Sequence, residues 1–128
     1  MRAGQNEEAL YHFDTALRLS PRDPGLWSYL TLKASTLYQL RRYEDAAKVA
    51  QEATRHPVAD LAWAYVHLAA SLGQLGRSSE AETAVAELRR RRPGLTVTGF
   101  REWPHSRSRS TAALSHTADG LRKAGLPE

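Results

Sequence analysis

The stretch EEALYHFDTALRLSP, residues 7–21, has the pattern of a helix that ends at a proline. Ala9, Phe13 and Ala16 follow one another at spacings of four and then three residues, so a helix carries all three on one face. Two small residues on a helix face allow a second helix to approach closely, and Pro21 ends the run because proline cannot continue a helix. The stretch therefore predicts an amphipathic helix that crosses a neighbouring helix.

The same pattern occurs twice more along the chain, in YEDAAKVAQEATRHP (residues 43–57) and in SSEAETAVAELRRRRP (residues 78–93). The first aligned alanines of these stretches, Ala46 and Ala81, follow Ala9 at spacings of 37 and then 35 residues. A pattern that recurs roughly every 20 to 50 residues is the signature of a repeat protein. The sequence therefore predicts three equivalent helices in a repeat array.

The segments between these helices also have helical periodicity. LWSYLTLKASTLYQL, residues 26–40, and LAWAYVHLAASLGQLG, residues 61–76, both place apolar residues three and four positions apart. We therefore expect an all-α fold of antiparallel helix pairs, in which each unit has a helix A, a short turn and a helix B.

Several residues have the character of helix ends. Asp23 before Pro24 has the form of an N-cap followed by proline in the first turn. Ser79 with Glu82 has the form of a capping box, and Gly76 is expected to break the chain between two helices.

The last unit resembles a tetratricopeptide repeat (TPR), a helix pair of about 34 residues. The positions that match the TPR signature are Tyr65, Leu68, Ala69, Leu72, Gly76, Ala81, Val85, Leu88 and Pro93. The middle unit departs from it at Lys33, where leucine is usual, and the first unit has no helix A. The resemblance covers roughly residues 5–95 and implies, over residues 1–95, a right-handed superhelix of about two and a half repeats.

The remaining third of the chain differs from the repeats. Residues 96–110 are expected to form a polar, basic connector that contains HSRSRS, and residues 111–128 a closing helix. Gly125 stands where a left-handed cap is needed, and Leu126 can fold back on the helix as in a Schellman motif. Pro127 prevents the helix from continuing.

Three short stretches carry a narrower resemblance: ALRLSPRDP (residues 16–24), PGLTV (residues 93–97) and GLRKAGLPE (residues 120–128). They are similar to the C-terminal TPR region of bacterial class III adenylate cyclases and related signalling proteins. The resemblance implies a regulatory segment whose catalytic or DNA-binding domain is not in this chain. The sequence departs from it at HSRSRSTAALSHTA, residues 105–118, where an acidic helix start with leucine is expected, and no residue of the cyclase chemistry can be carried over.

The composition is that of a soluble protein of 128 residues with a net charge of +4 and no cysteine. The absence of cysteine excludes a disulfide framework and a thiolate metal site. Most of the excess positive charge lies in two basic patches, residues 89–92 and residues 105–110. No stretch is apolar for long enough to cross a membrane, and the first residues contain no signal-peptide pattern, so we expect a cytoplasmic protein.

Residues that could carry chemistry lack the spacing that chemistry needs. The five histidines show no metal-binding spacing, and no glycine-rich phosphate loop is present. Acidic pairs such as Glu7 with Glu8 stand in the first turns of B helices, where they complement the helix dipole. We therefore expect no metal, no cofactor and no enzyme active site. The basic patches are not accompanied by a nucleic-acid reader module, so nucleic-acid binding is not expected either.

The resemblance to TPR proteins implies that a protein or peptide partner binds in the concave groove formed by the A helices. The residues expected in this groove are Ser28, Thr31, Ser35 and Tyr38 in the middle unit and Trp63, Val66, His67, Ala70 and Gln74 in the last unit. Tyr38 and Trp63 are the expected anchors, because aromatic residues carry much of the energy of interfaces. The alternative is that Trp63 only packs on a neighbouring helix. The lysine, asparagine and arginine of a chaperone-tail clamp are missing from the matching positions.

The first helix is expected to lack one of its two partner helices. Its apolar residues Leu10, Phe13 and Leu17 are therefore predicted to contact a second copy and to form a homodimer. A competing possibility is that the closing helix covers this face, within one chain or by exchange between two. The sequence thus predicts a non-catalytic protein–protein interaction module, and the alternative is the regulatory segment described above.

Overall fold

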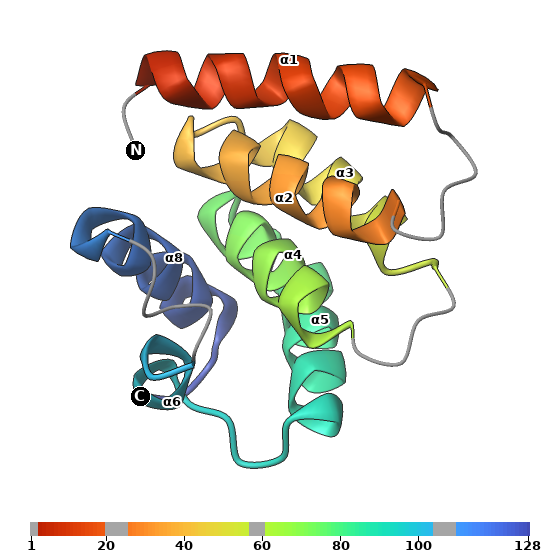
Figure 1. Ribbon diagram of the computed structural model, residues 1–128. Helices are drawn as coiled ribbons and strands as arrows, with labels where there is room; N and C mark the ends of the chain where they lie inside the picture. Colours follow the sequence, from red (N-terminus) through yellow and green to blue (C-terminus); the bar gives the residue numbers. More distant parts are fainter. Residues whose placement is uncertain (1–2, 20–25, 57–60, 104–109) are drawn as a thin grey trace.

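The computed structural model describes residues 3–19, 26–56, 61–103 and 110–128, and all regular secondary structure in these ranges is helical (Figure 1). The helices are α1 (Ala3–Leu19), α2 (Leu26–Gln39), α3 (Tyr43–Ala53), α4 (Ala62–Gln74), α5 (Ser78–Arg91), α6 (Val97–Arg101) and α8 (Thr111–Ala124). The expectation of an all-α fold is confirmed for these residues. Within them, no helix combines the length and the apolar character that crossing a bilayer requires.

Two antiparallel helix pairs, α2 with α3 and α4 with α5, form the body of the molecule, and α3 also packs on α4. The alanines that define the repeat lie in the core between them. Ala46 and Ala69 are fully buried, and Ala81 is 1% exposed. Because alanine adds only a methyl group, neighbouring helices approach closely at these positions. The buried alanines agree with the close helix crossing that the sequence predicts for the repeat helices.

Helices α2 and α4 end in the same way, 35 residues apart. The N–H of Arg42 donates to the carbonyl of Leu37 at 2.9 Å, and the equivalent bond at the end of α4 measures 3.1 Å. Each turn passes through one residue in the left-handed conformation, Arg41 (φ 63°) in the first and Gly76 (φ 71°) in the second. These bonds form a Schellman motif, which satisfies carbonyls at the helix end and reverses the chain into the next helix. The predicted break at Gly76 is confirmed.

These tight turns explain why the predicted capping box is wrong. Helix α5 begins at Ser78, and its N-cap is Arg77, whose side chain makes no capping bond. The Schellman turn leaves only residues 75–77 between the two helices, so Ser79 and Glu82 lie within α5 and are exposed. The other predicted cap, at residues 23–24, lies outside the described residues.

The predicted connector is more ordered than expected, because it contains α6. Thr96 is its N-cap and accepts a bond from the N–H of Gly99 at 3.1 Å. Backbone bonds then join α6 to the C-terminus of the chain: the N–H of Val97 donates to the carbonyl of Pro127 at 2.8 Å. Val97 and Phe100 are buried, so α6 belongs to the core.

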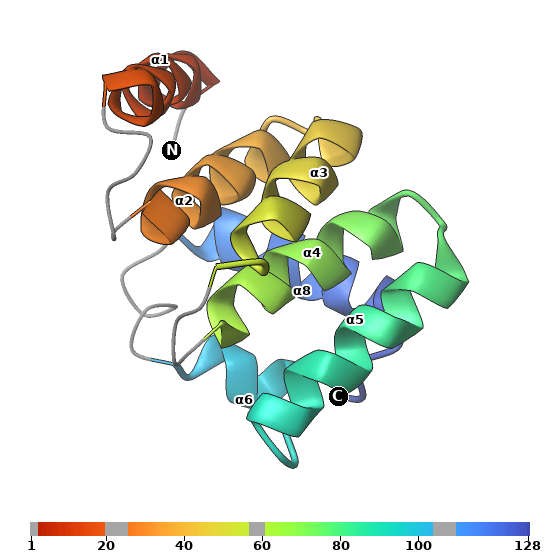
Figure 2. The same cartoon turned by 90° about the vertical axis from the view of Figure 1, so that its right-hand side faces the viewer.

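Helix α8 ends as predicted and lies against α4. The N–H of Leu126 donates to the carbonyl of Leu121 at 3.0 Å, and Gly125 has φ 106°, which together form the expected Schellman ending. Helix α4 is therefore central, with α3, α5 and α8 around it, whereas α1 is the outermost layer, beside α2 (Figure 1 and Figure 2).

Candidate interaction surface

The predicted groove residues lie on α2 and α4, and most of them are buried. Buried are Thr31, Ser35, Tyr38, Val66, His67 and Ala70, whereas Ser28, Trp63 and Gln74 are half-buried. The chain's own α6 and α8 pack on this surface. A partner that binds there would have to displace these helices or bind beside them, and the binding role of these residues remains a prediction.

Helix α8 crosses α4 at a contact between glycines. A Cβ atom on Gly73 would clash with the carbonyl oxygen of Gly120 and lie 2.7 Å from the backbone nitrogen of Ala124. A Cβ atom on Gly120 would lie 2.7 Å from the carbonyl oxygen of Ala70. Two helix backbones can come this close only where neither carries a side chain. The crossing therefore accepts a helix with a glycine at this position and no larger residue.

A chain of hydrogen bonds joins α8 to the ends of α2 and α4. The hydroxyl of Tyr38 donates to the carbonyl of His116, and Nε2 of Gln74 donates to the Tyr38 oxygen at 3.1 Å. Nζ of Lys123 in turn donates to Oε1 of Gln74 at 2.9 Å. Burial raises the pKa of the Tyr38 phenol above its usual value, so the hydroxyl keeps its proton and remains a donor.

The ring of His116 is held on both nitrogens. Nδ1 lies 3.0 Å from Oε1 of Gln39, and Nε2 lies 2.7 Å from the hydroxyl of Tyr43. The amide nitrogen of Gln39 donates to the carbonyl of Ala113 at 3.3 Å, which leaves its oxygen to face His116 as an acceptor. Nδ1 therefore carries the proton, and Nε2 accepts from Tyr43. Burial, followed by the charge of Arg41, lowers the pKa of His116, in agreement with this neutral ring.

The start of α4 is covered by aromatic side chains from α6 and the residues after it. The ring of Trp63 stacks on Phe100 with centroids 5.8 Å apart, and it lies 5.7 Å from the ring of Trp103. The guanidinium of Arg92 lies 5.8 Å from the Trp103 centroid. Trp63 therefore packs within the chain, which was the alternative to a role as a partner anchor.

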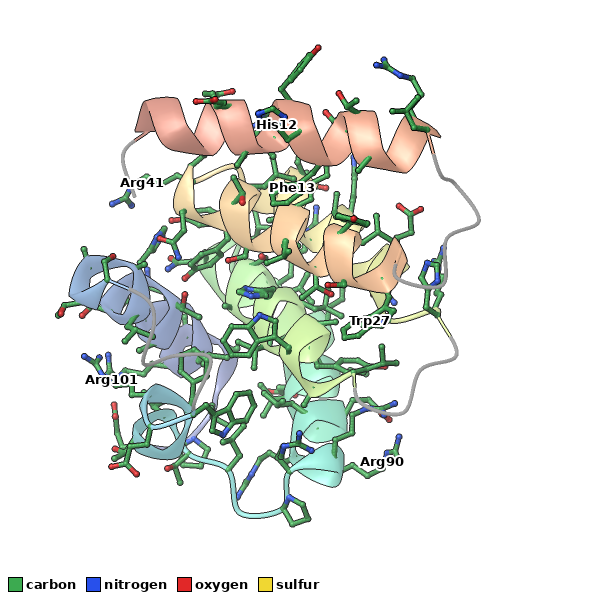
Figure 3. The ribbon with its side chains drawn as sticks, in the orientation of Figure 1. His12, Phe13, Trp27, Arg41, Arg90 and Arg101 are labelled. Atoms are coloured by element: carbon green, nitrogen blue, oxygen red, sulfur yellow. The ribbon has the colours of Figure 1, made fainter. Side chains whose placement is uncertain are left out.

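Two of the three predicted self-association residues, Leu10 and Phe13, lie toward the molecule's own α2. Leu10 is 7% exposed and belongs to the core, and Phe13 is half-buried and lies between α1 and α2 (Figure 3). The ion pair between Asp14 and Lys33, at 2.6 Å, joins the same two helices. Leu10 is therefore covered within one chain. Self-association through Leu10 and Phe13 remains a prediction, and the side chain of Leu17 lies outside the described part. The closing helix does not take this place either, because α8 packs on α4.

The basic patch at the end of α5 makes contacts within its own helix pair. Arg90 forms an ion pair with Glu87 at 3.0 Å, and the guanidinium of Arg91 lies 5.1 Å from the ring centroid of Tyr65. Cations at a helix C-terminus also complement the helix dipole. Most of the second patch, HSRSRS, lies outside the described residues.

Two hollows lie at equivalent places in the two helix pairs. One of about 440 Å³ lies between α3 and the α4–α5 pair and is lined by Leu68, Leu72 and Arg77, among others. The other, of about 290 Å³, lies one unit earlier, with Leu37 and Arg42 at equivalent positions. In the described ranges no group of three histidine, cysteine or acidic side chains could hold a metal ion.

Comparison of the chain with models of protein families, with curated proteins and with solved structures finds no match.

The sequence contained a signal for the α8 crossing that its periodicity did not reveal. Gly73 stands 35 residues after Tyr38, at the same place in the repeat. An interior glycine costs a helix about 1 kcal/mol relative to alanine, so its presence indicates a close approach of another backbone. Nothing in the local pattern identifies that backbone as α8.

Proposed function

We propose that this chain is a non-catalytic protein–protein interaction module of the cytoplasm, built as a short TPR-type array with a closing helix. The repeat of helix pairs at 35 residues, with the same turn after α2 and after α4, supports this proposal. The buried alanines at equivalent positions of the B helices support it too.

The observation that carries the proposal is the contact of α8 with α2 and α4. This face binds a helix by shape, at the glycine crossing, and by directed hydrogen bonds. Tyr38 and Gln39 donate to backbone carbonyls of α8, and Gln74 accepts from Lys123. Such a combination is selective, because a helix with a larger residue at the crossing or without the facing acceptors is excluded. We propose that the partner is a helical or peptide segment. It binds beside α8, near the half-buried Ser28, or takes the place of α8.

A crosslinking experiment tests this proposal. A photo-crosslinking amino acid is placed at Ser28, on the predicted surface, or at Thr83 on the exposed side of α5 as the matched control. We expect the Ser28 probe to attach to a protein that the Thr83 probe does not capture, and excess unmodified chain to compete with this attachment. Equal capture at both sites, or capture that the unmodified chain does not reduce, would contradict the proposal.

A second proposal is that the chain is the regulatory C-terminal segment of a nucleotide cyclase or of a transcription regulator. The similarity of GLRKAGLPE to the tail of cyclase-associated TPR regions supports it, together with the backbone bonds that hold this tail on α6. Both proposals predict that the chain alone converts no nucleotide. Turnover of ATP or GTP by the purified chain would rule out a non-catalytic role. The control is a core variant that unfolds the chain, which should abolish a genuine turnover.

A further inference from the structure

The exposed large apolar side chains of the described residues gather at one end of the molecule. Tyr11 and Leu19 on α1 are 66% and 74% exposed, and Tyr29 and Leu32 on α2 are 37% and 40% exposed. Their equivalents in α4, which stand 35 positions later in the sequence, are Ala64 and His67, and both are buried. Apolar residues scattered singly over a surface are ordinary, but a group on two adjoining helices marks an interaction surface.

Helix α1 has two distinct faces. One face packs on α2 through Leu10, and Asp14 is anchored there by Lys33. The opposite face, which we name the outer stripe, consists of Glu8, Tyr11, Thr15 and Arg18 at spacings of three and four residues. Leu19 lies beside its end, and no other helix of the described part packs along it (Figure 1 and Figure 2).

We infer that the outer stripe binds the same stripe of a second copy, with the two α1 helices antiparallel about a two-fold axis near residue 13. Charge complementarity supports this arrangement. Antiparallel pairing places Glu8 opposite Arg18 of the partner subunit, and the symmetry makes the contact twice. Parallel pairing would place Glu8 opposite Glu8 of the partner subunit, which is repulsive.

The sizes of the side chains agree with the same register. Tyr11 faces Thr15 of the partner subunit, so a large ring meets a small side chain on each side of the axis. The hydroxyl of Thr15 donates to the carbonyl of Tyr11 within its own helix at 2.9 Å, which leaves its methyl group for the contact.

The interface is small, so the dimer must be weak and sensitive to salt. A pair of helices lies at the low end of interface sizes, below about 1,200 Å², for which micromolar dissociation constants are ordinary. Charge pairs at the surface are screened at high ionic strength, so dimerisation should weaken as salt is added. This inference is independent of the proposed function, which concerns the opposite side of α2.

The test is a charge exchange followed by light scattering after size exclusion, over a series of concentrations of the full chain. We expect Glu8→Arg and Arg18→Glu each to weaken dimerisation about tenfold, because each replaces two attractive contacts by two repulsive ones. The double variant Glu8→Arg with Arg18→Glu should restore the dimer. Tyr11→Glu should abolish it, and Glu82→Arg, an equal charge change on the exposed side of α5, should leave it unchanged.

All the changed side chains are exposed, so circular dichroism should show the same helix content in every variant. A wild-type chain that stays monomeric at high micromolar concentration would overturn the inference. A dimer that Tyr11→Glu leaves intact would do so as well. The antiparallel register, and with it the proposal, would be excluded if both single variants dissociate and the double variant does not restore the dimer.

Discussion

Helices α2 and α4 occupy the same place in successive repeats, yet α2 has exposed apolar side chains, Tyr29 and Leu32, whereas α4 has no exposed side chain. Both end in the same turn, and both pack on a following B helix through alanines. Leu68 lies in the core, whereas its equivalent Lys33 reaches out to Asp14 on α1. Gly73 admits α8, whereas its equivalent Tyr38 donates a hydrogen bond to that helix.

This comparison separates two kinds of information in a repeat protein. The positions that the two helices share determine how a unit forms its own pair. The positions at which they differ determine which helix from outside the pair packs on the opposite face of each one. A repeat sequence therefore specifies the unit more strongly than it specifies the neighbours of the unit.

The largest effect should come from the position where the two helices differ most. Gly73→Ala places a Cβ atom against the backbone of α8, which cannot move away without separating the helices. We expect a loss of about 3 kcal/mol or more in the free energy of unfolding, at the upper end for overpacked sites. Urea denaturation measures it.

The matched control is Gly99→Ala on α6. There the new Cβ atom would lie 3.4 Å from the side-chain oxygen of Thr96, which is tolerable, so the change should be within about 0.5 kcal/mol. Equal effects of the two alanines would show that α8 does not pack tightly on α4.

A smaller effect is expected where the B helices share an alanine. Ala81→Leu fills a site that is 1% exposed and should cost about 1–3 kcal/mol by overpacking. Ala9→Leu, at the equivalent site of α1, should cost less than about 1 kcal/mol because this site is only half-buried. Thermal melts of the two variants compare these sites, and an unchanged melting temperature for Ala81→Leu would contradict the repeat register.

The two left-handed turns offer a reciprocal exchange. Arg41→Gly removes the strain of a side chain at φ 63° and should stabilise the protein by roughly 0.5–1 kcal/mol. Gly76→Ala at φ 71° should destabilise it by about 1 kcal/mol. Denaturant midpoints measure both changes, and effects of the same sign would mean that the two turns are not equivalent.

The smallest effect concerns the attachment of α8 to α2 at acid pH. Because the pKa of His116 is lowered by folding, the unfolded chain binds its proton first as the pH falls. Stability should therefore be complete above the ordinary histidine pKa of about 6.5 and decrease as the pH falls from there toward the lowered pKa.

Melting temperatures of the wild type and of His116→Gln across this range isolate the contribution. Acid should destabilise His116→Gln less than it destabilises the wild type. It should destabilise His12→Gln, a change on the exposed side of α1, as much as the wild type. A decrease of the same size in all three proteins would place the acid sensitivity elsewhere.

What the sequence determined by itself was local. Apolar spacing and alanine positions were sufficient to predict the helix pairs, and glycines were sufficient to predict the break at Gly76 and the left-handed end at Gly125. Each of these features depends on residues within about one or two helix turns, so a single segment contains all the information. Where a tight turn left no room for a cap, as at Ser79, the same local reasoning failed.

The tertiary structure alone decided the position of α8, and this position determines that α8 covers part of the surface predicted to form the groove. The contacts that place it join Tyr38, Gln39 and Gly73 to residues far along the chain, such as His116 and Gly120. Their fit exists only after the helix pairs have formed and brought the ends of α2 and α4 together. The physical reason is that helix formation is set by neighbours in sequence, whereas the choice of a packing partner is set by the shape and hydrogen-bonding groups of a surface that the folded units create.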